Sequence, residues 1–135
     1  MWLSKYVLRS GKGIIINDSS IQFMLVKRYD EVEIEDVKEG GASNVKIQWL
    51  IDEKIGRTFA MRRFVVGKGG HTPLHHHDWE HGVFVLEGEG ALVDKNGKEY
   101  PLRPGNFAFV EPNEIHQFVN KGENNFIFLC IIPLP

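Results

Sequence analysis

Short stretches rich in β-branched and aromatic residues, separated by turn residues at intervals of about ten residues, constrain the fold of this chain most strongly. Residues 45–49 alternate polar and apolar side chains, as a strand with one buried face does. Similar stretches follow at 107–110, 115–119 and 126–132. We expect about eight to ten short strands, which indicates an all-β sandwich or barrel.

Turn residues divide these stretches. The pair Asn96-Gly97 favours a tight hairpin between two short strands. The glycines between residues 67 and 70 are expected to end a strand at 58–66. A helical turn is expected only near residues 30–38, where the pattern is weak.

The N-terminal residues differ in composition from the rest of the chain. Residues 1–23 contain two turn-rich segments that flank the triplet Ile14-Ile15-Ile16, whereas a clearer strand pattern starts at Met24. We therefore treat 1–23 as an extension and 24–135 as a single β-barrel domain. The alternative is that the extension adds an ordinary strand to the sheet.

Charge and cysteine content exclude several classes of protein. The chain has 16 basic and 18 acidic residues and a formal charge of −2, which favours neither nucleic-acid nor membrane binding. The single cysteine, Cys130, excludes an internal disulfide. No secretory signal pattern and no apolar run of about 20 residues is present, so a cytoplasmic location is expected.

Histidines cluster in a way that the bulk composition does not predict. The chain has six, and five of them lie between residues 71 and 81. On a strand, His75 and His77 share one face and His76 takes the other. His81 follows across a turn at Asp78, and His116 lies on a later predicted strand.

We therefore predict that His75, His77, His81 and His116 bind one metal ion, because neutral imidazole is a common metal ligand. An exposed histidine-rich loop is the alternative. Glu80 is a rival to His81 as a ligand, but it should point to the opposite side of the strand.

The histidine segment resembles the first conserved motif of the cupin family. Gly69, His75, His77 and Gly88 fall in register with that motif, and His81 occupies the position where glutamate is usual. Residues 105–120, which include His116, resemble the second motif. The second match is looser, because Pro112 is one place late and Glu114 replaces the usual glycine.

This resemblance implies a cupin barrel, also described as a double-stranded β-helix or jelly roll. More specifically, the sequence resembles small single-domain cupins in which four histidines hold manganese or another divalent ion. Iron, zinc, nickel and copper are further candidates. The resemblance also implies a small-molecule ligand and a homodimer.

Four residues are candidates for the pocket wall. Phe128 and Cys130 share one face of the last predicted strand, and by resemblance they point toward the metal. Cys130 is alternatively a small buried hydrophobic residue. Trp79 is either a lid or a residue packed on the barrel rim. His71 either supports the ligands or belongs to a loop.

Four neutral imidazoles would leave the full charge on a divalent ion and make it a strong Lewis acid. This favours a metal-dependent oxidoreductase of the dioxygenase type. The alternatives are a metal-dependent isomerase or lyase that acts on a sugar or hydroxy acid, and a non-enzymatic module that binds a small ligand.

Overall fold

The computed structural model describes residues 14–18 and 22–135, which fall into two compact units. The first reaches to Glu33 and contains an antiparallel hairpin of β1 (Ile14–Asp18) and β2 (Gln22–Val26). A 3-10 turn, η1 (Tyr29–Glu31), follows this hairpin. Much of the predicted extension at residues 1–23 lies outside the described residues, and the domain boundary after residue 23 stays a prediction.

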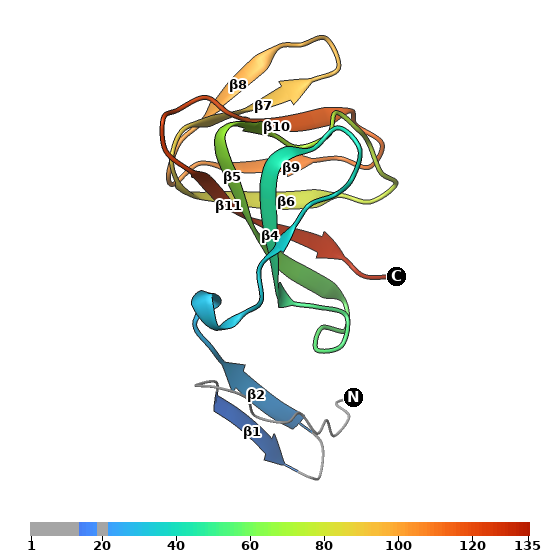
Figure 1. Ribbon diagram of the computed structural model, residues 1–135. Helices are drawn as coiled ribbons and strands as arrows, with labels where there is room; N and C mark the ends of the chain where they lie inside the picture. Colours follow the sequence, from blue (N-terminus) through green and yellow to red (C-terminus); the bar gives the residue numbers. More distant parts are fainter. Residues whose placement is uncertain (1–13, 19–21) are drawn as a thin grey trace. The chain divides into compact units, whose positions relative to one another are not determined.

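The second unit, Ile34–Pro135, is built from nine described strands in one antiparallel sheet. They are β3 (Glu35–Asp36), β4 (Ser43–Ile51), β5 (Phe59–His71), β6 (His81–Glu87), β7 (Gly90–Asp94), β8 (Glu99–Leu102), β9 (Phe107–Val110), β10 (His116–Asn120) and β11 (Phe126–Pro133). The strand order is β8-β7-β10-β5-β11-β6-β9, while β4 pairs with β5 and β3 pairs with β4. The sheet curls into a nearly closed barrel (Figure 1), which confirms the predicted all-β barrel.

Strand β5 is longer than the sequence pattern predicts. The glycines after Val66 do not end it, and it continues to His71. Asn44 adopts a left-handed conformation with φ of 56° where β4 bulges opposite them, and its Nδ2 donates to Lys68 O at 3.3 Å. A side chain at Gly67 would collide with that amide, and one at Gly70 would collide with the backbone oxygen of Ser43. The glycines therefore allow the two backbones to approach at the bulge.

The expected helical turn at residues 30–38 is also mostly wrong. The segment contains only the end of η1 and the two-residue strand β3. Few apolar residues lie at helical spacing here, and β3 instead pairs with β4 through Glu35 and Ile47.

Along β11 the barrel core largely follows a period of two. Phe126, Phe128, Cys130 and Ile132 alternate along β11 and are all buried, as the parity of the sequence predicts. The rings of Phe64 and Phe128 stack with centroids 5.3 Å apart. Burial of each such side chain contributes about 2 kcal/mol, so this face stabilises the barrel and fixes the strand register.

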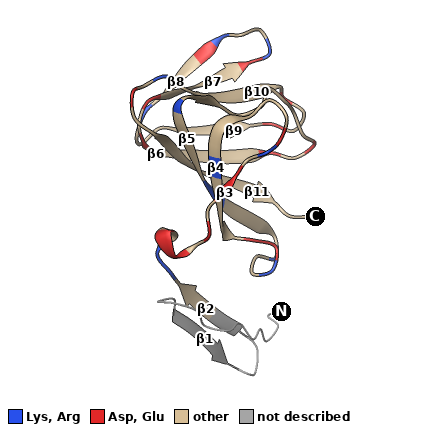
Figure 2. Ribbon diagram, viewed as in Figure 1, with Lys and Arg blue, Asp and Glu red and all other residues tan. Residues whose placement is uncertain are grey.

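Charged side chains of both signs are interspersed over this unit. In the view of Figure 2, Lys and Arg alternate with Asp and Glu, mainly along loops and strand ends. Described ion pairs such as Lys68–Glu123 and Lys121–Glu99 are exposed and contribute little to stability. The interior of the barrel is therefore the part with distinctive chemistry.

Candidate metal centre

His75 pairs with strand β10 through an isolated antiparallel β-bridge to His116. The His75 amide donates to His116 O at 3.1 Å, and the His116 amide donates to His75 O at 2.9 Å. His75 therefore forms a single bridge, and residues 76–77 are irregular, so the strand predicted for residues 75–77 is not formed. The predicted alternation still holds: His75 and His77 line a cavity, whereas His76 is exposed.

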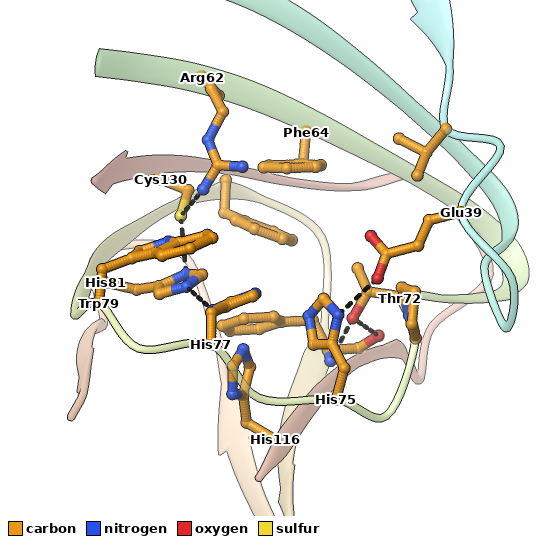
Figure 3. Close-up of a pocket in the computed structure, with 14 residues that line it drawn as sticks. Glu39, Arg62, Phe64, Thr72, His75, His77, Trp79, His81, His116 and Cys130 are labelled. Atoms are coloured by element: carbon orange, nitrogen blue, oxygen red, sulfur yellow. Dashed lines mark hydrogen bonds and ion pairs between the residues drawn. The ribbon is translucent and has the colours of Figure 1, made fainter. Parts of the chain in front are cut away.

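Three histidines converge at this cavity. One ring nitrogen from each of His75, His77 and His116 lies within 4.8 Å of the others (Figure 3). Two nitrogens at about 2.1 Å from a common ion lie at most about 4.2 Å apart, so small ring rotations bring these three to bonding distance. The donor set fits a divalent ion that accepts imidazole ligands.

Hydrogen bonds fix which ring nitrogen is free in two of these histidines. Nδ1 of His116 lies 2.7 Å from Glu114 O and must donate, because a carbonyl oxygen only accepts. Nδ1 of His75 donates to Oε2 of Glu39 at 2.8 Å. In both rings Nε2 therefore keeps its lone pair, as a metal-binding histidine requires.

His81 lies beside this cluster rather than within it. It is buried at the start of β6, with its Nε2 2.7 Å from Nδ1 of His77 and its Nδ1 3.4 Å from Sγ of Cys130. Its ring lies 5.1 Å from that of His116, centroid to centroid, as the ring of His75 does, but His81 is not part of the group whose nitrogens lie within 4.8 Å of one another. The described geometry thus joins three histidines at one point, and the predicted fourth ligand stays a prediction.

Burial is the main reason that His77, His81 and His116 are neutral at neutral pH. Burial first, and then neighbouring histidines and Arg62, lower the pKa of His77 to about 4 and that of His81 to about 3. Burial also lowers the pKa of His116. At neutral pH each of these three rings is therefore neutral and keeps a lone pair on one of its two nitrogens.

The cavity next to the histidines has a volume of about 300 Å³ and mostly apolar walls. Its described lining consists of Val37, Glu39, Arg62, Phe64, Thr72, Pro73, His75, His77, Trp79, His81, His116, Phe118, Phe128 and Cys130. Strands β5, β6, β10 and β11 contribute many of these residues, and the loop before β4 contributes Glu39. This is the size and composition of a small-molecule site.

The other predicted pocket residues are placed as follows. Phe128, Cys130 and Trp79 line the cavity, and Trp79 is 40% exposed with its ring stacked on His77. His71 ends β5 away from the described lining, where its Nδ1 lies 3.2 Å from Thr72 O. Glu80, the rival ligand, is exposed and also outside that lining. Burial raises the pKa of Cys130, so its thiol is protonated.

Sequence reasoning missed Arg62 and Glu39. Arg62 has the same parity as the buried Phe64 and Val66 on β5, so the alternation itself could have marked an inward-facing arginine. Glu39 lies in a loop and reaches the site from 36 residues before His75. No local pattern predicts that contact.

No helix among the described residues is long and apolar enough to span a membrane.

Comparison with known proteins agrees with this architecture. The family model of the cupin domain matches residues 62–132. An oxalate-binding protein of Thermotoga maritima is 31% identical over 132 residues, which cover 94% of this chain and 99% of that protein. Among solved structures, the polyketide cyclase RemF of Streptomyces resistomycificus is 35% identical with a TM-score of 0.76, over 82% of this chain and 79% of the cyclase.

A third relative has a different activity again. A glucose-6-phosphate isomerase of Thermococcus onnurineus is 27% identical over 132 residues, which cover 90% of this chain but only 65% of the isomerase. Binding protein, isomerase and cyclase thus share one fold, so the activity must be argued from the site.

Proposed function

This chain belongs to the cupin family, and we propose that it binds one divalent metal ion and acts as a metal-dependent oxidoreductase of the dioxygenase type on a small molecule. The convergence of His75, His77 and His116 at an apolar-walled cavity carries this proposal. A substrate in that cavity would be shielded from water beside the ion.

The bound ion would supply Lewis acidity and, for manganese or iron, one-electron redox chemistry. The protein holds the ligand rings in place. The β-bridge fixes the backbones of His75 and His116 relative to each other, and Glu39 and Glu114 O orient their rings. Manganese is our first choice of metal, on the resemblance to small four-histidine cupins, and His81 is the proposed fourth ligand.

The polar groups of the cavity favour metal-centred chemistry over acid–base catalysis by a pair of carboxylates. Glu39 is the only Asp or Glu in its described lining, and it is hydrogen-bonded to His75. The described lining residues therefore do not include the two carboxylates that such acid–base catalysis requires.

The test begins with metal content. Purified protein is analysed for bound metals, stripped with a chelator and reloaded separately with manganese, iron, zinc, nickel or copper. Oxygen uptake is then measured with catechols, β-diketones and thiols. We expect uptake with a redox-active metal and none with the stripped protein. Loaded protein that consumes no oxygen with any of these substrates would contradict the oxidoreductase proposal.

A second candidate is isomerase or lyase chemistry on a sugar or hydroxy acid. Its support is the likeness to the glucose-6-phosphate isomerase over 90% of this chain. Turnover of such substrates under strict anaerobiosis would favour it. A third candidate, a non-enzymatic binding module, has support from the likeness to the oxalate-binding protein. Tight ligand binding without turnover in either assay would favour that role.

We also propose that the protein forms a homodimer through the outer surface of β6 and β9. Phe84, Phe107 and Phe109 are 47%, 79% and 59% exposed there, and Phe84 pairs with Phe107 across the two strands. Within the described sheet, β9 is an edge strand that pairs only with β6. A second copy can add to such an edge about a two-fold axis and cover the aromatic rings.

A further inference from the structure

Arg62 lies on the cavity wall with no carboxylate partner among the described residues. Its Nη2 donates to Sγ of Cys130 at 3.0 Å, directly across the β5–β11 pairing. Its Nε is buried and has no hydrogen-bond partner among the described residues. No described Asp or Glu forms a salt bridge with its guanidinium.

Aromatic rings hold this guanidinium in place. It lies over the ring of Trp49, 5.5 Å from the centroid, and over the ring of Phe64, at 5.0 Å. Figure 3 shows it beside Cys130, while Glu39 lies with His75 and Thr72 on another part of the wall. A planar, fixed guanidinium on the cavity wall is suited to a planar anion.

The charge distribution of the cavity also favours an anion at Arg62. Arg62 is the only Lys or Arg in the described lining, and the one carboxylate there, on Glu39, is bonded to His75. A bound anion would supply the counter-charge that no described carboxylate supplies to this guanidinium. The remaining wall near Arg62, formed by Phe64, Phe118 and Phe128, is apolar.

We propose that Arg62 determines substrate specificity: it binds the carboxylate of a small monocarboxylic acid whose apolar body packs against Phe64, Phe118 and Phe128. This inference rests on the proposed function, since it assigns the substrate class of the same cavity. A sugar phosphate fits less well, because its hydroxyl groups would meet the aromatic walls. The cavity volume of about 300 Å³ suits an acid with one ring.

The test uses benzoate, phenylacetate and phenylpyruvate as probes, with benzamide as the neutral counterpart of benzoate. Isothermal titration calorimetry is performed on metal-free and metal-loaded protein. We expect at least one acid to bind, benzamide to bind about tenfold or more weakly than benzoate, and glucose 6-phosphate to bind no better than benzamide. If no acid binds in either form, or if glucose 6-phosphate binds best, the proposal is wrong.

Variants separate recognition from packing. Arg62→Met keeps an apolar stem over Trp49 and Phe64 but removes the charge. We expect it to weaken acid binding about tenfold to a hundredfold while benzamide binding stays within about twofold. Arg62→Lys should recover part of the affinity. Arg103→Met, at an exposed arginine paired with Glu89, changes the net charge equally and should leave binding unchanged.

The measurements on the Arg62→Met protein separate this inference from the proposed metal chemistry. Unchanged acid affinity in a folded Arg62→Met protein, as judged by its thermal unfolding, would overturn the proposal. Metal content is measured on the same samples. If the protein binds acids through Arg62 but holds no metal, only the proposed metal chemistry is refuted. If the protein binds metal but its acid affinity does not depend on Arg62, only this inference is refuted.

Discussion

Nδ1 of His75 lies 2.8 Å from Oε2 of Glu39, a residue 36 positions earlier in the chain. This contact joins the loop before β4 to the histidine segment after β5. A carboxylate that accepts from a ligating imidazole orients the ring and increases the basicity of its other nitrogen. Glu39 therefore acts on the proposed metal site through His75.

The first prediction concerns Glu39. Glu39→Gln removes the charge but keeps the shape, so we expect metal affinity to fall about tenfold, and up to about a hundredfold. Competition with a chromogenic chelator measures this. Glu123→Gln, at an exposed glutamate paired with Lys68, is the control and should leave affinity unchanged. Equal affinities for the Glu39 and Glu123 variants would contradict the assigned role.

The second prediction concerns the ligands themselves. Alanine in place of His75, His77 or His116 should reduce bound metal to a small fraction of the wild-type amount, because each removes one of the three converging donors. His76→Ala is the control, since His76 is exposed and outside the cavity lining. Elemental analysis of the purified variants measures the outcome. Comparable metal loss from His76→Ala would show that the face assignment is wrong.

His81→Ala decides between three and four ligands. If His81 bonds the ion, this variant should lose metal as severely as His116→Ala does. If His81 only hydrogen-bonds His77, as the 2.7 Å contact shows in the described geometry, the loss should be smaller.

Local patterns in the sequence were enough to predict most strands. Residues 107–110 match β9 from end to end, and the Asn96-Gly97 pair forms the expected hairpin, with Gly97 at φ of 80°. The extent of β5 could not be predicted in this way. Glycine usually interrupts a strand, and only the opposing bulge at Asn44 makes it the residue that fits there.

The site was predictable only in part, for a similar reason. Parity places His75 and His77 toward one cavity without knowledge of the fold. The contacts of Glu39 and Arg62 depend on which strands and loops meet in three dimensions, and alternation could at most mark Arg62 as facing inward.

The third prediction concerns the pH dependence of stability in the metal-free protein. Burial lowers the pKa of His77 to about 4 and that of His81 to about 3, whereas in the unfolded chain both return toward 6.5. Above pH 6.5 the rings are neutral in both states. Below it the unfolded chain binds protons that the folded protein excludes, so the free energy of unfolding should fall as the pH falls from 6.5 through 4.

Urea denaturation across this window measures the effect. His81→Gln removes one of the rings whose pKa burial lowers, so the stability of this variant should decline less steeply with falling pH than that of the wild type. Identical slopes for the two proteins would show that His81 does not contribute.

The last prediction concerns the proposed homodimer. Phe107 and Phe109 point outward from the edge strand β9 and are 79% and 59% exposed. Lysine at both positions places two charges on the surface that a second copy should cover, and charged residues on an edge strand oppose pairing with another chain. Analytical ultracentrifugation should then find a dimer for the wild type and a monomer for Phe107→Lys/Phe109→Lys. Tyr100→Lys, on the opposite edge strand β8, should remain a dimer. A wild-type protein that sediments as a monomer, or a double variant that stays dimeric, would exclude this interface.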